Sequence, residues 1–179
     1  MEAKRTQTKV AIHYGALYGL AAIAVSLLFY FFKTDIQSKL PQYSAWVVQI
    51  VFIAMGIKSF RDEDLGGYIS YGKSVGTGIL ISIFGGIIAA IFSIVFFVYI
   101  APEMKQMILD AAQQKMGEQG GMTDEQMEIA MEWTAKMMSP GWLFFLSILG
   151  SVVMGLIFSL IISVFMKRDA NPFKSNLGS

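Results

Sequence analysis

The residues that could do chemistry in this chain are few, and they form no recognisable catalytic set. There is one histidine, His13, and there are no cysteines. A catalytic or pH-sensing histidine needs a partner carboxylate, and none lies near His13 in the sequence. The sequence also lacks GxSxG, HExxH and a phosphate-binding glycine loop. We therefore predict that the protein is not an enzyme and uses no cofactor.

Methionine is the one soft metal ligand present in numbers. Eight of the twelve methionines lie within residues 101–140, and Met104 and Met107 are spaced to share one helix face. Thioethers bind Cu(I), but neither His nor Cys supplements these sulfurs. Methionine also fills adaptable apolar surfaces that meet lipid or a partner protein, and this is the interpretation we adopt. No metal site is therefore predicted.

Gln49 is the one strongly polar side chain of the second apolar run. Inside a membrane its amide would form a hydrogen bond between helices, worth roughly 1 kcal/mol or less. The alternative is a contact with a transported solute. No Asp, Glu, Lys or Arg falls inside the four apolar cores, which argues against ion-coupled transport.

The elements that must position these residues are four long apolar runs. The chain is 55% hydrophobic with a mean hydropathy of +0.56, whereas soluble domains are about 45–50% apolar. These values predict an all-α, polytopic membrane protein forming a single integral domain over 1–179. The expected transmembrane helices span about 12–32, 43–60, 74–100 and 142–166. The net charge of +1 offers no strong field to recruit nucleic acid.

Residues 103–139 are the one sizeable polar segment, and helical spacing on both sides of a glycine-rich break predicts a hairpin of two amphipathic helices. The first helix is expected at about 103–116 and the second at 123–138. Thr123 and Gln126 resemble a capping box that opens the second helix. Met127, Met131 and Met138 line one face of that helix, which we expect membrane, protein or a partner to cover.

Small residues recur every fourth position on two of the apolar runs and place one helix face close to a neighbour. On the third run they are Ser74, Gly78, Ser82, Gly86 and Ala90, and on the fourth Ser147, Ser151, Gly155, Ser159 and Ser163. We expect part of the first row to pack on the second and the remainder to stay free for another subunit. Gly15 and Gly19 open the first run as a further packing pair.

An internal duplication is a second interpretation of the glycines. Tyr14-Gly15 with Gly19 opens the first run, and Tyr71-Gly72 with Gly76 opens the third. Two hairpins running the same way would resemble parallel-repeat transporters. Glycine pairs of this kind are also what any packed membrane helix needs, so both explanations stay open.

Positive charge predicts the orientation. Nine basic residues fall on the side that holds both termini and the 58–73 connection, against five on the other side. The nine are Lys4, Arg5, Lys9, Lys58, Arg61, Lys73, Lys167, Arg168 and Lys174, and the five are Lys33, Lys39, Lys105, Lys115 and Lys136. Both termini are therefore expected in the cytoplasm, which puts the 103–139 hairpin outside. The cytoplasmic cations could also hold anionic lipid head groups.

Four short segments, 13–20, 58–62, 67–74 and 99–103, carry a family resemblance. In them the chain resembles a bacterial membrane family catalogued as domain of unknown function 4199, over about His13 to Lys167. The resemblance implies a four-span protein of the bacterial cytoplasmic (inner) membrane. It implies no catalytic or binding residue, because the family has no assigned activity.

Two functions of different class follow from these patterns. The first is a non-enzymatic integral membrane scaffold or accessory subunit, which meets lipid and associates with itself or with another membrane protein. The second is a small channel or carrier for a lipid or neutral solute, formed by an oligomer of four-helix units. Gln49 distinguishes them, because a carrier should need its amide whereas a scaffold should tolerate leucine.

Overall fold

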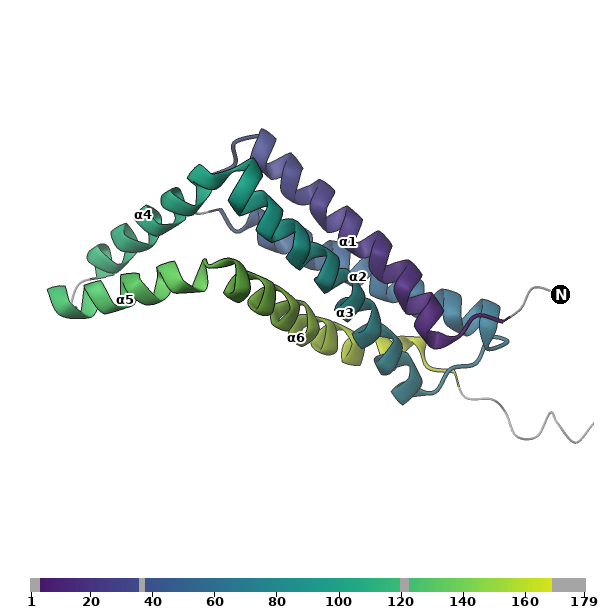
Figure 1. Ribbon diagram of the computed structural model, residues 1–179. Helices are drawn as coiled ribbons and strands as arrows, with labels where there is room; N and C mark the ends of the chain where they lie inside the picture. The colour runs from purple at the N-terminus through teal and green to yellow at the C-terminus, as the bar shows by residue number, and fades with distance from the viewer. Residues whose placement is uncertain (1–3, 36–37, 120–122, 169–179) are drawn as a thin grey trace, which may run out of the picture.

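The computed structural model describes residues 4–35, 38–119 and 123–168, and its elements there are helices (Figure 1). They are α1 (Gln7–Phe31), α2 (Leu40–Ser59), α3 (Tyr71–Val95), α4 (Pro102–Gln119), α5 (Asp124–Met137) and α6 (Pro140–Met166). Two π-helical segments, η1 (Phe60–Asp64) and η2 (Phe96–Ile100), extend α2 and α3. Four helices are long and apolar enough to cross a membrane: Gln7–Phe31, Leu40–Asp64, Tyr71–Ile100 and Pro140–Met166. The predicted all-α class with four candidate membrane spans is therefore confirmed.

Two of the spans begin or end at other residues than hydropathy predicts, because local hydrogen bonds decide where a helix begins and ends. α1 begins five residues before the expected start at 12, because the Thr6 hydroxyl accepts a hydrogen bond from the Lys9 amide. The second span continues past the expected end at 60, because Leu65 N donates to Phe60 O and closes a π turn around the charged residues. The predicted capping box of Thr123 and Gln126 opens α5.

α3 is the central helix, with α1 on one of its faces and α6 on another, while α2 contacts all three (Figure 1). The buried apolar core lies toward the end of the bundle that holds the N-terminal segment. It consists of Val10, Ala11, Ile53, Ile57, Phe60, Ile69 and Ile81. These residues come from α1, α2, η1, the α2–α3 connection and α3, so the core ties these elements together.

The contact between α3 and α6 is a row of small residues, which we name the α3–α6 seam. The two helices are antiparallel, and Ser163 Oγ donates to Ser74 Oγ across the seam at 2.7 Å. A methyl group at Gly78 would lie 2.8 Å from Ser159 Cβ, and one at Gly86 would lie 2.9 Å from Ser151 Cβ. Gly155 faces Ser82 in the same way. The backbones therefore approach as closely as only glycine and serine allow.

The seam differs from the expectation that part of the α3 row would be left free for another subunit. All five α3 positions are buried within the single chain. On α6, Gly155, Ser159 and Ser163 are buried, while Ser147 and Ser151 are half-buried. The α3 row packs on α6 over several turns, because antiparallel helices with the same four-residue spacing keep their small residues opposite each other.

A second close contact joins α1 to α3. A methyl group at Gly15 would lie 2.7 Å from Phe84 Cβ, and one at Gly19 would lie 2.7 Å from Ile88 Cβ. By contrast, Gly72 has no atom within 4 Å of such a methyl group. The two Tyr-Gly motifs therefore have different surroundings, and helix packing gives no support to an internal duplication.

The two ends of the bundle are built differently. At one end the N-terminal segment, the α2–α3 connection and the last turn of α6 meet, and Ile69 and Arg168 exchange two backbone hydrogen bonds of 3.0 Å. At the opposite end α4 and α5 contact each other and project away from the long helices (Figure 1). Tyr30 Oη donates to Glu103 Oε1 at 3.2 Å and ties the start of α4 to α1. The first and last residues that the structure describes, 4 and 168, both lie at the end of the bundle opposite α4 and α5.

The seam generates a test with a matched control on the same helix. Gly155→Ala should lower the free energy of unfolding by about 1–3 kcal/mol, because the new methyl group overlaps Ser82. Gly150→Ala should be neutral or stabilise by up to about 1 kcal/mol, since nothing lies within 4 Å of its methyl group and alanine favours helix. Denaturant titration in detergent micelles measures both. Equal stability of the two variants would show that the seam is not closely packed at this point.

Candidate functional site

One polar side chain from each candidate membrane span meets inside the bundle, and we name this set the intramembrane polar network. Its members are Tyr18 of α1, Gln49 of α2, Ser82 of α3 and Ser151 of α6. Ser151 Oγ donates to the Ser82 carbonyl oxygen at 2.9 Å. Tyr18 Oη and Ser151 Oγ share a hydrogen bond of 3.4 Å. Seam serines thus become hydrogen-bonding partners for the two helices on either side.

Gln49 is the centre of this network, and it is 2% exposed. Its Nε2 donates to Ser82 Oγ at 3.1 Å and to the Ser151 carbonyl oxygen at 2.8 Å. Ser82 Oγ in turn donates to the Gly78 carbonyl oxygen at 3.0 Å, one turn earlier on its own helix. The amide of Gln49 therefore joins α2 to both helices of the seam. Of its two possible roles, the helix-to-helix hydrogen bond is the one that this geometry supports.

Ser159 is the exception among the seam serines. It is fully buried, and its hydroxyl oxygen is the one buried side-chain polar atom of the described residues without a hydrogen-bond partner. Its neighbour across the seam is Gly78, which has no side chain to offer. The close helix contact at this point is thus made at the expense of a hydrogen bond, a cost of roughly 1–3 kcal/mol for a buried hydroxyl.

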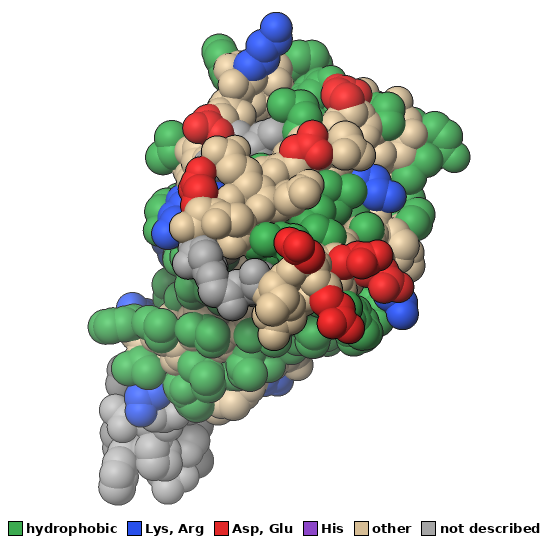
Figure 2. Space-filling view, turned by 90° about the vertical axis from the view of Figure 1, so that its left-hand side faces the viewer, with side chains coloured by type: hydrophobic (Ala, Val, Ile, Leu, Met, Phe, Trp, Pro, Cys, Tyr) green, Lys and Arg blue, Asp and Glu red, His purple; other side chains and the backbone are tan. Residues whose placement is uncertain are grey.

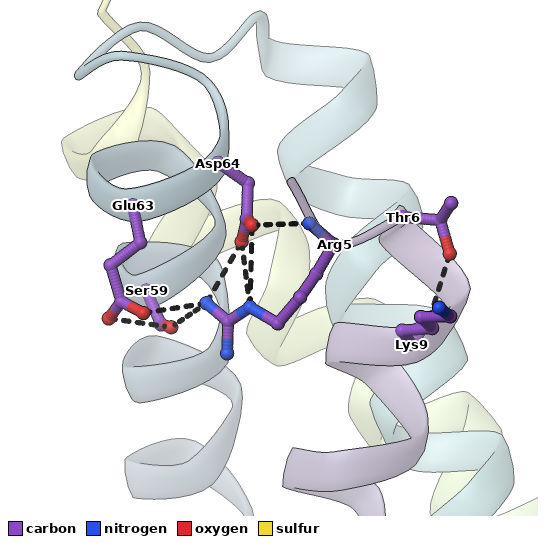
Figure 3. Close-up of polar contacts among 6 residues, drawn as sticks. All are labelled: Arg5, Thr6, Lys9, Ser59, Glu63 and Asp64. Carbon is purple, nitrogen blue, oxygen red and sulfur yellow. Dashed lines mark hydrogen bonds and ion pairs between the residues drawn. The ribbon is translucent and has the colours of Figure 1, made fainter. Parts of the chain in front are cut away.

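A second polar cluster, the terminal clasp, lies at the end of the bundle where the N-terminal segment meets η1 (Figure 3). It consists of Arg5, Ser59, Glu63 and Asp64. The Arg5 amide donates to Asp64 Oδ1 at 2.7 Å, and Arg5 Nη2 lies 2.9 Å from Asp64 Oδ2 and 2.7 Å from Glu63 Oε2. The hydrogen bonds that the Arg5 side chain donates to the Asp64 carboxylate raise the pKa of Arg5 above its ordinary value. The N-terminal segment is thereby fixed to the second span.

The π turn at the end of the second span holds two buried charged residues. It closes from Leu65 N to Phe60 O, and within it Arg61 and Asp64 are both buried although both are charged. Arg61 pairs with Asp62 through an Nε–Oδ1 contact of 2.6 Å and donates from Nη1 to the Met166 carbonyl oxygen at 3.2 Å. One five-residue segment therefore ties the second span both to the N-terminal segment and to the end of α6.

Sequence reasoning singled out Gln49 and the small residues, and the structure brings these together. It did not anticipate the terminal clasp, because Arg5 and Asp64 are 59 residues apart and nothing in their spacing links them. The remaining candidates lie elsewhere. His13 is exposed with its ring 5.2 Å from that of Tyr14, Met104 is half-buried, and Met107 is exposed on α4. The described arrangement can join helices, and it aligns no nucleophile with a base.

The network predicts an energetic coupling between Gln49 and Ser82. In a double-mutant cycle, Gln49→Leu and Ser82→Ala should each destabilise the protein, and the pair should cost less than the two single changes added together. The expected coupling is about 0.6 kcal/mol, the average for interhelical hydrogen bonds in membranes, and at most about 1.7 kcal/mol. Denaturant titration of the four proteins measures it. Strict additivity would show that the amide contributes nothing to this contact.

Comparison with known proteins gives one result. A family described as "Protein of unknown function (DUF4199)" matches residues 13–168. No curated protein and no solved structure matches the chain. The match covers all four candidate spans and the α4–α5 projection, apart from the first turns of α1. The chain therefore belongs to the DUF4199 family of proteins of unknown function.

Proposed function

We propose that the protein is a non-enzymatic integral membrane scaffold or accessory subunit, which associates with itself or with another membrane protein. The observation that carries the proposal is the use of the polar side chains inside the spans. Gln49, Ser82 and Ser151 bond to one another across helices. A carrier needs polar groups that can turn toward a solute, whereas a scaffold needs them to hold its helices together.

The projection formed by α4 and α5 is the part of this scaffold that we expect to meet a partner. α5 presents Ile129, Trp133 and Met137 at four-residue spacing, and each is about half exposed, at 50%, 52% and 47%. Its other apolar face is partly covered, since Met127 and Met131 are half-buried and Met138 is buried. A helix with one covered and one open apolar face is suited to a further contact.

We further infer that both termini lie in the cytoplasm of a bacterium and that the α4–α5 projection lies outside. The basic residues support this orientation. The acidity of the projection fits it without adding support, because the positive-inside rule counts positive charge. Acidic side chains are spread over the face that α4 and α5 form, between apolar ones (Figure 2). They are Glu103, Asp110, Glu118, Asp124, Glu125, Glu128 and Glu132, all exposed. The basic residues favour the opposite end, as the positive-inside rule requires of the cytoplasmic side.

Cysteine labelling tests the orientation in this cysteine-free chain. Ser70→Cys lies on the exposed α2–α3 connection, and Gln113→Cys lies on an exposed face of α4. In intact cells a membrane-impermeant maleimide should label position 113 and leave position 70 unlabelled until the cells are opened. Both sites are exposed, so accessibility in opened cells serves as the control. Labelling of position 70 alone in intact cells would place the projection inside.

Photo-crosslinking tests the scaffold. A photoreactive amino acid at Trp133 should form a discrete protein adduct in native membranes, containing either a second copy or another membrane protein. The same group at Phe165, which is 81% exposed on α6, should react with lipid instead. If position 133 gives no protein adduct while the purified protein transports a neutral solute that Gln49→Leu abolishes, the protein is a carrier and the scaffold proposal fails.

A further inference from the structure

The end of the bundle that holds the terminal clasp carries an excess of positive charge. Its described residues include eight cations and three acids, an excess of five positive charges. The cations are Lys4, Arg5, Lys9, Lys58, Arg61, Lys73, Lys167 and Arg168, and the acids are Asp62, Glu63 and Asp64. Each acid is already paired, Glu63 and Asp64 with Arg5 and Asp62 with Arg61. The excess therefore lies on the remaining basic side chains.

Several of these side chains gather where α2 and α6 end. The hydrogen bond from Arg61 Nη1 to the Met166 carbonyl oxygen joins the two helix ends directly. Lys58 and Arg168 both interact electrostatically with Asp62, so both lie near the Arg61–Asp62 pair. Since Arg61 neutralises Asp62, the charges of Lys58, Lys167 and Arg168 remain for an outside anion. All three side chains are exposed, and no acid within salt-bridge distance is found for them among the described residues.

Exposed apolar side chains lie along α2 and α6 next to Lys58, Lys167 and Arg168. On α2, Met55 and Val51 lie one and two turns before Lys58 and are 48% and 45% exposed. On α6, Ile161 and Phe165 share a face of the last turns and are 56% and 81% exposed. Residues three or four apart share a helix face, so the α2 stripe ends at Lys58. The α6 stripe ends at the last turn of the helix, and Lys167 and Arg168 follow that turn directly in the chain. This combination matches a molecule with an anionic head and apolar chains.

We propose that the ends of α2 and α6 form a binding site for an anionic phospholipid. Its phosphate lies among Lys58, Lys167 and Arg168, and its acyl chains follow the stripes that end at Met55 and Phe165. Cations at a membrane surface attract anionic lipids with about 1 kcal/mol each, so three cations correspond to roughly a hundredfold preference over a zwitterionic lipid. The other cations of this end are less suited. Arg5 is held by two carboxylates, and Lys73 lies over the ring of Phe60 at 5.6 Å.

Native mass spectrometry tests the site in the full-length protein. The protein is released from vesicles of equal phosphatidylglycerol and phosphatidylcholine, and the retained lipid is identified. The parent should retain phosphatidylglycerol, and the triple variant Lys58→Gln, Lys167→Gln, Arg168→Gln should bind it about a hundredfold more weakly. The matched control, Lys105→Gln with Lys115→Gln and Lys136→Gln at the opposite end, should behave as the parent. Equal retention by all three proteins, or an equal loss in the control, overturns the proposal.

A second measurement does not depend on the folding of a variant. Photoactivatable phosphatidylglycerol is bound to the parent protein, and the labelled peptides are mapped. Labels should fall on the last turns of α2 and α6, and excess glycerol phosphate or inorganic phosphate should not displace the lipid. Labels spread over all four spans would show that lipid meets the protein without a site. Displacement by the soluble phosphates would show a site for free phosphate, and either result contradicts the proposal.

Discussion

The structure depends on the close approach of α3 to two neighbours. In a bilayer the lipid tails are as apolar as the side chains, so burying apolar surface gives helices little reason to meet. What remains is close packing and polar contact, and both improve when the backbones approach. α3 achieves this on one face with Gly78 and Gly86 against serines of α6, and on another with Gly85 against Gly15. The central position of α3 follows from having two such faces.

The buried hydrogen bonds are a consequence of this packing. Because the seam brings Ser82 and Ser151 together, a single amide on α2 reaches both helices from one position. In an apolar medium such bonds are not contested by water, yet the same medium makes an unpaired group costly. Gln49 is satisfied in this way, whereas Ser159 lies opposite a glycine without a partner. Packing density and hydrogen bonding therefore compete along one interface, and the balance differs from turn to turn.

The charged residues at the two ends of the bundle make different contacts. At the end with the termini, charged residues are used internally: η1 fixes the N-terminal segment through Arg5 and the end of α6 through the Met166 carbonyl. At the other end, the charges of α4 and α5 stay on the surface, and the two helices contact each other while they project away from the long helices (Figure 1). A bundle with a projecting helical pair suits the scaffold role that we propose.

The sequence by itself determined the class of the protein, because the length and hydropathy of a membrane helix are local properties of the chain. It also determined the capping box at Thr123, which depends on residues three positions apart. Tertiary structure alone decided which small residues meet, that Gln49 joins α2 to both helices of the seam, and that Arg5 pairs with Asp64. These contacts join residues from different helices, often far apart in the chain. Four-residue spacing shows that a face can pack closely but does not name its neighbour, which is set by how all the helices share α3.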